Sequence, residues 1–459
     1  MCGIIGVTHH KDAAQIAYSG LYALQHRGEE SAGIASYDNK DIHLVKSPGL
    51  VADAFDDRAL KELKGSTAIG HCRYSTTGSS NYKNIQPFLV THRGKHIAIA
   101  HNGNLTNTEA LYKKLEDEGA IFQTSMDSEV IIHLLARAKN GSVEKWFLDV
   151  LSQLEGAFSL VFLYENMIIG ARDPNGFRPL CLGKIDGSYI LASESCALDL
   201  IGAEFIRELE CGEVVFISGT EITSKFLPKT KETKHSHCVF ENIYFARPDS
   251  DIFNDNVYQV RKRLGAQLAK EAPVDADFVM AIPDSGNYAA IGYAEELGVP
   301  FEVGIIRNHY IGRTFIQPTQ FLRDLRVKIK LNPIRDVLKG KKIIVVEDSI
   351  VRGTTSRSRV ESLRKAGAKE IHMRISCPPI KSPCFYGIDF PDEKELIASN
   401  KEVDEIAKFI KVDSLKYLSL EGMLSVMKES EGFCHACFTG KYPVKPPRNK
   451  SKYLLEGTK

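Results

Sequence analysis

The sequence lacks several features that would place it in whole classes of protein. No apolar run reaches the length of about 20 residues that crosses a bilayer, and the chain does not open on the basic and apolar segments of a secretory signal. The formal net charge is only +1, so nothing indicates broad attraction to nucleic acid or to a membrane surface. Internal repeats and low-complexity blocks are also missing. These absences predict a cytoplasmic protein with no nucleic-acid or membrane partner.

The composition that remains is that of a globular protein with a sizeable core. A length of 459 residues suggests two or three domains, and 43% of the residues are hydrophobic. The sequence contains ten cysteines. In a reducing compartment cysteines serve more often as metal ligands, nucleophiles or core residues than as disulfides.

The pattern along the chain divides it into two halves. Up to about residue 225, many short β-rich runs alternate with only two or three helices, one of them predicted over 128–139, which is typical of an α+β domain. The polar stretch "LPKTKETKHSH" (227–237) has no apolar period, so we predict domains over 2–230 and 231–459. The second half alternates strand and helix, which indicates a parallel sheet with crossover helices, and ends in a helical tail from about residue 392.

The most specific local signal is "IIVVEDSIVRGTTSRSRV" (343–360). A buried strand ends in two acids, and a loop of small residues then opens a helix. A helix N-terminus beside glycine and threonine suits a phosphate, whereas the acids can hold ribose hydroxyls or Mg²⁺. It is neither a Walker loop nor a GxGxxG turn. The candidate ligand-binding residues are Glu347, Asp348, Ser349, Arg352, Gly353, Thr354 and Thr355.

This segment resembles the motif that binds phosphoribosyl pyrophosphate (PRPP) in type I phosphoribosyltransferases, although many members have aspartate where Glu347 stands. The resemblance implies that "IPDSGNYAA" (282–290) is the pyrophosphate loop. Ser285 is then a candidate Mg²⁺ contact beside Glu347 and Asp348. The segment 307–330 is a candidate lid over the polyphosphate, and a merely solvated loop is an equally good interpretation.

The start of the chain, "MCGIIGV", has two interpretations. Cys2 is either a buried residue of an edge strand, or, once Met1 is removed, a nucleophile that carries its own base. An α-amine has a pKa of about 7.7–8.0, which suits a base that later acts as an acid. Hydrolysis of a carboxamide also needs an oxyanion hole, for which Asn102 and the N–H of Gly103 are candidates.

Two more residues could bind the charged α-groups of glutamine. Arg73 could bind the α-carboxylate and Asp127 the α-ammonium. Together with "QHRGEESAGI" (25–34), "HNGNL" (101–105) and the segment around Arg73, this set resembles class II glutamine amidotransferase domains. The resemblance implies the N-terminal nucleophile hydrolase fold, with αββα layers.

An amidotransferase half joined to a phosphoribosyltransferase half resembles the glutamine PRPP amidotransferase family, as does "FARPDS" (245–250). The resemblance implies that ammonia released at Cys2 reacts with PRPP to give 5-phosphoribosylamine, the first step of purine synthesis de novo. It also implies one Mg²⁺ per subunit, inhibition by purine nucleotides, and a homotetramer or homodimer. Glucosamine-6-phosphate synthase and asparagine synthetase share the front half only. A non-catalytic PRPP-sensing regulator is the alternative from another class, but it would not need Cys2.

Four cysteines could form a metal centre. "GFCHACFTGKYP" (432–443) contains Cys434 and Cys437 in a CxxC pair, and Cys238 and Cys384 could complete the set. The spacing alone favours zinc and leaves an iron–sulfur cluster or a redox pair open. The family resemblance, to its Bacillus-like branch, implies one structural [4Fe–4S] cluster per subunit. Cys377 is the rival of Cys384, which the resemblance favours because "FYGIDF" follows it.

Overall fold

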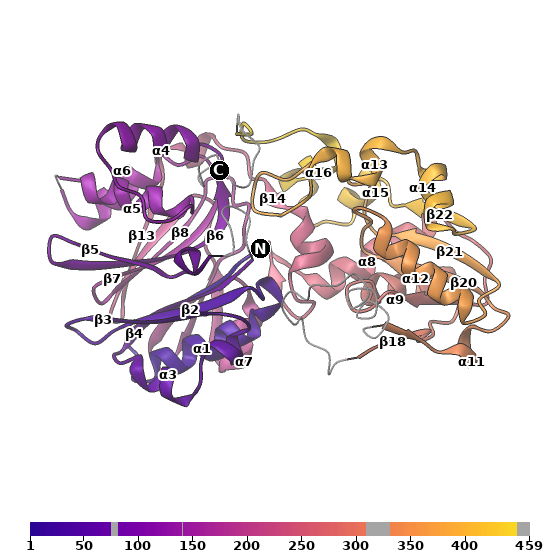
Figure 1. The fold of residues 1–459 in the computed structure, drawn as a ribbon, viewed down its shortest axis with the longest axis horizontal. Coiled ribbons are helices and arrows are strands. Elements are labelled where there is room, and N and C mark those ends of the chain that lie inside the picture. The colour runs from indigo at the N-terminus through magenta and orange to yellow at the C-terminus, as the bar shows by residue number, and fades with distance from the viewer. Residues whose placement is uncertain (75–80, 140, 309–330, 448–459) are drawn as a thin grey trace.

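The computed structural model of the chain describes residues 1–74, 81–139, 141–308 and 331–447. Two antiparallel sheets form the first half (Figure 1), in the orders β11-β9-β10-β1-β4-β2-β3 and β13-β12-β8-β7-β6-β5. The first sheet consists of β1 (Gly3–Val7), β2 (Ser31–Tyr37), β3 (Ile42–Pro48), β4 (Thr67–Arg73), β9 (Cys181–Ile185), β10 (Ser188–Ala192) and β11 (Glu204–Glu208). The second consists of β5 (Phe88–His92), β6 (Lys95–Leu105), β7 (Gly156–Tyr164), β8 (Met167–Arg172), β12 (Glu213–Ser218) and β13 (Glu221–Phe226).

Helices cover the outer face of each sheet, so the first half has four layers in the order αββα. One apolar cluster lies between the two sheets, and Ile4, Ile69 and Val161 belong to it. On the first sheet lie α1 (Ala13–Ala23), α2 (Val51–Ala54), α3 (Asp57–Glu62) and α7 (Ser195–Ile201); on the second lie α4 (Thr108–Asp117), α5 (Ser128–Arg137) and α6 (Val143–Leu151). The predicted fold is confirmed, but the expectation of two or three helices was wrong, because several are only one or two turns long.

The second half is built on a parallel sheet in the order β17-β20-β21-β22. These strands are β17 (Phe278–Ala281), β20 (Lys342–Glu347), β21 (Glu370–Ile375) and β22 (Ser414–Tyr417), and the longer helices are α8 (Val257–Glu271), α9 (Asn287–Leu297), α12 (Thr354–Lys365) and α14 (Val403–Ile410). The parallel sheet was predicted. The tail was predicted to be helical; it does contain several short helices, and it also adds β22, which completes the sheet because Leu415 packs into its core.

Short elements connect these layers. They are β14 (His237–Cys238), β15 (Asp251–Ile252), β16 (Asp255–Asn256), β18 (Ile305–Arg307), β19 (Leu331–Pro333), β23 (Phe433–Cys434), α11 (Arg335–Leu338), α13 (Ile397–Asn400), α15 (Leu420–Ser425) and α16 (Ala436–Thr439). The proposed boundary at residue 230 falls in a short 3₁₀ turn, Pro228–Glu232.

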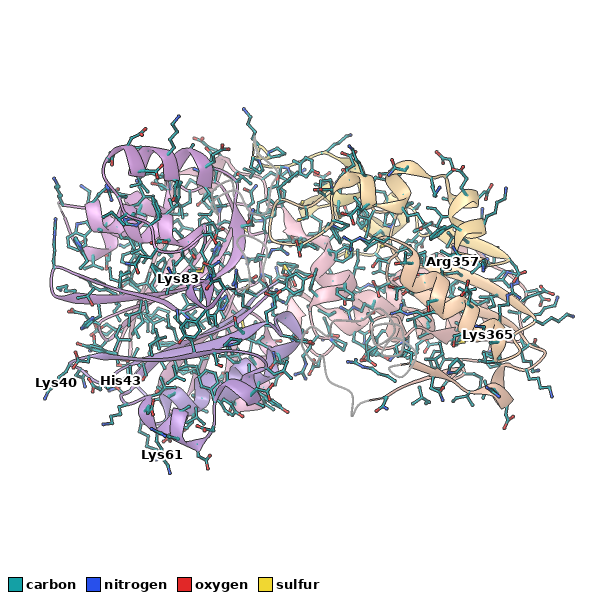
Figure 2. All side chains as sticks on the ribbon, viewed as in Figure 1. Lys40, His43, Lys61, Lys83, Arg357 and Lys365 are labelled. Atoms are coloured by element: carbon teal, nitrogen blue, oxygen red, sulfur yellow. The ribbon has the colours of Figure 1, made fainter. Side chains whose placement is uncertain are left out.

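Charged side chains such as Lys40, Lys61 and Lys365 lie at the periphery (Figure 2). In the described part of the chain, none of the helices combines the length and the apolar character needed to span a membrane.

A buried network of charges joins the two halves. Arg27 forms ion pairs with Glu194 and with Glu241, the latter at 2.8 Å, and Arg178 lies 3.3 Å from Glu241. All four side chains have no exposed surface. Ser250 donates a further hydrogen bond to Glu194 at 2.7 Å. Two cations and two anions balance, so the network stabilises the interface only while every member is present.

We expect this interface to loosen in acid. Burial raises the pKa of Glu194, but the charges of His26 and Arg27 more than offset it, so the pKa lies well below the ordinary value of 4.5. Because the folded pKa is lowered, the stability that Glu194 contributes is present above pH 4.5 and is lost as the pH falls below it. Thermal unfolding measured from pH 7 down to pH 2 should show a Tm that falls progressively below pH 4.5.

The variant Glu194→Gln separates this contribution from general acid denaturation. It should unfold at lower temperature than the parent at pH 7, by about 3–5 kcal/mol of stability, because it leaves Arg27 partly unpaired. Its Tm should also fall less steeply in acid. The exposed Glu204→Gln should behave like the parent. Parallel curves for all three proteins would contradict the assignment.

Candidate active sites

Cys2 lies where the chain enters the first sheet. Its thiol is 3.5 Å from both the backbone nitrogen and the carbonyl oxygen of Tyr74, and its backbone nitrogen donates to Oδ1 of Asn102 at 3.2 Å. Strands β1 and β6, from different sheets, thus bring the predicted nucleophile and the predicted oxyanion residue together. Met1 precedes it with only 1% of its surface exposed, in the apolar core of the second half.

Asn102 has the properties of an oxyanion donor. Its side chain is fully buried, and its Nδ2 has no hydrogen-bond partner among the described residues. A buried donor without a partner costs about 1–3 kcal/mol, which a negatively charged oxygen beside Cys2 would offset. Gly103 follows it on β6, and a Cβ there would lie 2.1 Å from the carbonyl oxygen of Ala157, so only glycine fits.

The two predicted glutamine-binding residues are both buried. Arg73 is the last residue of β4, directly after Cys72, which pairs with Gly3, so it lies at the same end of the sheet as Cys2. Asp127 lies 3.3 Å from Nδ1 of His101 and accepts a hydrogen bond from the N–H of Leu105 at 3.0 Å.

The environment keeps Asp127 ionised. Burial raises its pKa, but the charge of His101 and the hydrogen bonds outweigh burial, so the pKa is lowered overall. An ionised carboxylate at this position suits an ammonium group. His101 was missed as a supporting residue, although it begins the predicted motif "HNGNL".

The predicted phosphate loop joins β20 to α12. Gly353 adopts a φ of +75°, which L side chains rarely adopt. A Cβ there would also lie only 2.7 Å from Cδ1 of Ile397, so both the backbone conformation and the space require glycine. Thr354 and Thr355 form the exposed start of α12. Arg352 is exposed and donates to Glu395 at 2.7 Å. The loop therefore presents a helix N-terminus, hydroxyls and a cation at the carboxyl edge of the sheet.

The two adjacent acids have different surroundings. Glu347 forms an ion pair with Arg359 and accepts a hydrogen bond from Ser356 at 3.1 Å. Burial raises its pKa to about 7, although Arg359 opposes the shift. Asp348 instead accepts hydrogen bonds from Ser349 and, at 2.5 Å, from the hydroxyl of Ser285.

The predicted Mg²⁺ donors Ser285 and Asp348 therefore lie together, and their oxygens are of the type that Mg²⁺ prefers. Glu347 lies next to them in sequence but is held by Arg359. Arg359 was missed, because nothing in the sequence distinguishes it from the other basic residues of α12, such as Arg357.

The phosphate loop opens on a cavity of about 790 Å³ between the halves. Asp348, Ser349 and Thr355 line it from the second half, and Glu29 and Tyr74 line it from the first. Since the backbone of Tyr74 contacts the thiol of Cys2, the wall of this cavity reaches the nucleophile.

The four predicted cluster ligands come together at the junction of the halves. Strands β14 and β23 pair in parallel with Cys238 opposite Cys434. Burial, followed by the charges of Cys238, Cys434 and Cys384 in that order, raises the pKa of Cys437 well above its usual value. Cys377 has the weakest such effect, and its own thiol donates to the carbonyl of Pro378 at 3.3 Å.

The spacing of these thiols is wider than that of a tetrahedral zinc site. In a tetrahedral zinc site, bonds of about 2.3 Å place sulfur atoms about 3.8 Å apart. Within the described residues, no three of the four sulfur atoms lie within 4.8 Å of one another. As the structure places them, the four thiols therefore do not have the spacing of a tetrahedral zinc site.

Cys384 also begins a segment that reaches the oxyanion strand. Its Sγ accepts a hydrogen bond from the N–H of Tyr386 at 3.3 Å, and the carbonyl of Phe385 accepts one from Nδ2 of Asn104 at 3.0 Å. Gly387 lies so close to Gly103 that a Cβ on it would be 3.1 Å from the carbonyl carbon of Gly103. The segment from Cys384 to Gly387 therefore connects a predicted cluster ligand to the strand that carries Asn102 and Gly103.

Two sequence predictions fall outside the described residues. They concern residues 75–80, in the motif around Arg73, and residues 309–330, which make up most of the candidate lid.

Comparison with known families assigns both halves. A glutamine amidotransferase domain model matches residues 71–200, and a phosphoribosyl transferase domain model matches residues 250–388. The chain is 47% identical to the amidophosphoribosyltransferase of Archaeoglobus fulgidus, over 97% of this chain and 99% of that one. It is 49% identical to the Methanocaldococcus jannaschii enzyme of the same name, over 97% and 98%.

Solved structures agree with this assignment along the whole chain. One, described as the allosteric regulatory enzyme of purine biosynthesis, superimposes with a TM-score of 0.94 at 46% identity and covers 100% of this chain and 99% of its own. Another is glutamine PRPP amidotransferase from B. subtilis complexed with ADP and GMP. It has a TM-score of 0.93 at 45% identity, over 99% of this chain and 100% of its own.

Proposed function

This chain belongs to the amidophosphoribosyltransferase family, and we propose that its two sites act in sequence across the cavity between the halves. The enzyme converts glutamine, PRPP and water into 5-phosphoribosylamine, glutamate and pyrophosphate, the first step of purine biosynthesis de novo. The observation that supports the sequential action is that Tyr74 contacts the Cys2 thiol and also lines the cavity that holds the phosphate loop.

At the first site, Cys2 is the nucleophile. Once Met1 is removed, the α-amine takes the thiol proton, and the sulfur attacks the side-chain carboxamide carbon of glutamine. The carbonyl oxygen becomes an oxyanion that Nδ2 of Asn102 and the N–H of Gly103 stabilise. The C–N bond breaks, the amine returns its proton to the leaving nitrogen as ammonia departs, and water hydrolyses the thioester to glutamate.

Arg73 and Asp127 position the substrate for this attack. Arg73 forms a bidentate ion pair with the α-carboxylate of glutamine through its planar guanidinium group. The ionised Asp127 accepts hydrogen bonds from the α-ammonium. Both are buried, so the pairs form away from bulk water, where they are stronger.

At the second site, the loop from Ser349 to Thr355 binds the phosphate of PRPP at the start of α12, while Glu347 and Asp348 face the ribose. Ser285 and Asp348 are the residues that would hold one Mg²⁺ per subunit, with Glu347 beside them. When bound, Mg²⁺ neutralises charge on the departing pyrophosphate. Ammonia attacks the anomeric carbon as the bond to pyrophosphate breaks.

We propose one structural [4Fe–4S] cluster per subunit on Cys238, Cys384, Cys434 and Cys437. The spacing of their sulfur atoms, wider than in a tetrahedral zinc site, supports it, as does the burial of Cys238, Cys434 and Cys437 close to one another. Through the Asn104–Phe385 hydrogen bond, the cluster would hold the oxyanion strand in place.

Enzyme purified without oxygen should therefore contain iron and acid-labile sulfide. Cys384→Ser should lose most of the iron, because it removes a ligand, and its glutaminase activity should fall as the Phe385 segment loosens. Cys377→Ser is the matched control and should keep its iron. A colourless protein with stoichiometric zinc on the four thiols, or equal iron loss in the two variants, would reject this ligand set.

Stoichiometry tests the sequential action of the two sites. With glutamine as nitrogen donor, glutamate and pyrophosphate should form in a ratio of about one to one, since each ammonia that crosses the cavity consumes one PRPP. Added glutamate dehydrogenase, which traps ammonia from solution, should not lower pyrophosphate release. A large excess of glutamate, or full interception by the trap, would show that ammonia leaves through solvent. The alternative of a non-catalytic regulator predicts neither product.

The remaining expectations concern assembly and control. The B. subtilis relative is complexed with ADP and GMP, and we expect purine nucleotides to inhibit this enzyme as well. We also expect a homotetramer or homodimer, as the family resemblance implies. A cytoplasmic location is expected because no disulfide joins the ten cysteines, all of which the structure describes. Some relatives are chloroplastic.

A further inference from the structure

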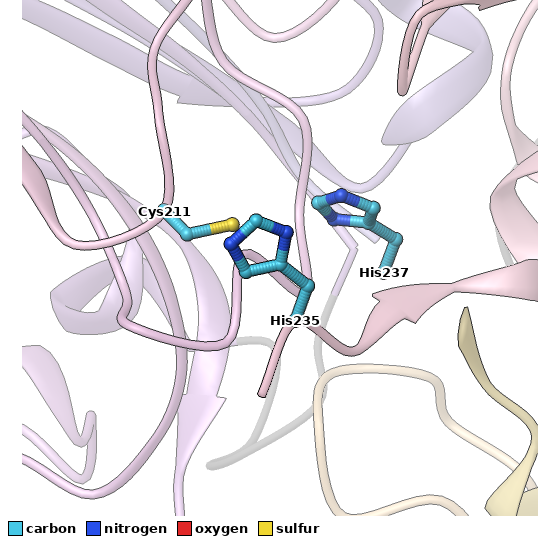
Figure 3. Close-up of side chains that lie close together, drawn as sticks. All are labelled: Cys211, His235 and His237. Atoms are coloured by element: carbon cyan, nitrogen blue, oxygen red, sulfur yellow. The ribbon is translucent and has the colours of Figure 1, made fainter. Parts of the chain in front are cut away.

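A second group of metal-binding side chains lies at the junction of the halves, apart from the four cluster cysteines. The thiol of Cys211 and the rings of His235 and His237 have ligand atoms within 4.8 Å of one another. Figure 3 shows the three side chains pointing toward one another. We propose that they bind one Zn²⁺ ion or a similar borderline-soft divalent cation.

The hydrogen bonds of His237 prepare it as a ligand. Its Nδ1 lies 2.8 Å from the carbonyl of Gly176, which also accepts a hydrogen bond from Arg172 at 3.0 Å. The shorter contact, to a carbonyl that can only accept, favours the tautomer with the proton on Nδ1 over the one that would accept from Arg172 at 3.3 Å, and this tautomer leaves the lone pair of Nε2 for a metal. Metal-binding histidines usually have this arrangement. Stacking on Phe253, with ring centroids 4.4 Å apart, fixes the plane of the ring.

The approach of Cys211 to His237 depends on a glycine. Gly176 has a φ of +64°, and a Cβ there would lie 2.3 Å from Sγ of Cys211 and 3.1 Å from the ring of His237. The glycine thus provides the space in which thiol and imidazole meet. His235 is exposed, which gives the ion a route from solvent and leaves room for water as a fourth ligand.

The charges around the group permit a cation. Arg172 is the nearby positive group, at 3.3 Å from Nδ1 of His237, and it is paired with Glu208 at 3.4 Å. The thiolate of Cys211 would cancel one of the two charges of the ion. Zinc binds sulfur and imidazole nitrogen in preference to oxygen, which matches this donor set.

A metal bound here would connect the first half to the segment that carries His235 and His237. Cys211 precedes β12 of the first half, whereas His235 and His237 lie in the segment that leads to Cys238. An ion held by all three would fix the start of β14, and with it one ligand of the proposed cluster. The zinc site is nevertheless separate in its residues, so it can be tested while the cluster stays loaded.

The test uses the full chain purified without oxygen, with its iron measured, then equilibrated with Zn²⁺ and dialysed. We expect one zinc per chain in addition to the iron, and zinc K-edge X-ray absorption showing one sulfur and two imidazole ligands. Cys211→Ser and His235→Ala should each weaken zinc binding by at least about tenfold, since even indirect ligand supports contribute 10–100-fold, and should leave the iron content unchanged.

Cys181→Ser, a buried thiol of β9, and His9→Ala, an exposed imidazole, are the matched controls and should bind zinc like the parent. Absence of bound zinc, a zinc spectrum dominated by several sulfur ligands, or unchanged affinity in both Cys211→Ser and His235→Ala would overturn the proposal. None of these results depends on glutaminase or transferase activity, so the two proposals fail separately.

Discussion

Replacing Cys2 with alanine should lower glutamine-dependent formation of 5-phosphoribosylamine by at least about 10⁴-fold, the scale seen when a catalytic nucleophile is removed. The reason is that no other thiol lies beside Asn102 in the described structure, so no thioester can form. Synthesis from added ammonia should remain near the parent level, because ammonia needs only the PRPP site. The two rates are measured as pyrophosphate release with glutamine or with an ammonium salt at alkaline pH.

Cys72→Ala provides the matched control for this experiment. Cys72 pairs with Gly3 in the sheet, so its thiol lies next to the N-terminal segment. Burial raises its pKa to about 12, which makes it a poor nucleophile. The control should keep both activities, apart from a modest loss of stability. If Cys2→Ala kept its glutamine-dependent rate, or if Cys72→Ala lost it, the assignment of the nucleophile would be wrong.

Asp348→Asn should show the opposite pattern. It should lower pyrophosphate release from glutamine and from ammonia alike by about 10²–10³-fold, the usual cost of removing one group that stabilises transition-state charge. The amide cannot offer Mg²⁺ the charged oxygen that now lies 2.5 Å from Ser285. Hydrolysis of glutamine without PRPP should persist, because Asp348 contacts none of the residues around Cys2.

The exposed Asp336, in α11, provides the control variant Asp336→Asn, which should match the parent. Raising the Mg²⁺ concentration should restore part of the Asp348→Asn rate if the defect is in metal binding. Loss of the ammonia-dependent rate in Asp336→Asn, or an unaltered rate in Asp348→Asn, would contradict the proposed role.

The sequence named candidate site residues, but it did not predict their surroundings. Cys2 and Asn102 were named from short motifs, because nucleophiles and oxyanion donors belong to few residue types. The unpartnered Nδ2 of Asn102 and its contact with Cys2 depend on two strands of different sheets, which no local pattern encodes. The same holds for Arg359, which pairs with Glu347 only because α12 folds back over the end of β20.

The fold shows the same contrast between local and distant effects. Short β-rich runs predicted an α+β first half, and the alternation of strand and helix predicted the parallel sheet. Strand β22 was missed because Ser414–Tyr417 is short and mixed in polarity, and only its place beside β21 makes it a strand. The ion pairs of Arg27 with Glu194 and Glu241 join residues about 170 to 210 positions apart and could not be inferred from spacing.

The burial of Met1 sets the order in which the chain is processed and folded. Met1 is buried, with 1% of its surface exposed, so a peptidase can reach it only before the N-terminal segment docks against the second half. In the unprocessed chain the nitrogen of Cys2 is an amide and cannot act as a base. Processing and assembly are therefore expected to occur in that order.

The mass of the intact, active enzyme tests this account most directly. Purified enzyme that uses glutamine should have a polypeptide mass corresponding to a chain that begins at Cys2, with a free α-amine beside the thiol. Full glutamine-dependent activity in enzyme that still carries Met1 would contradict the central claim, because the base that the mechanism requires would then be absent.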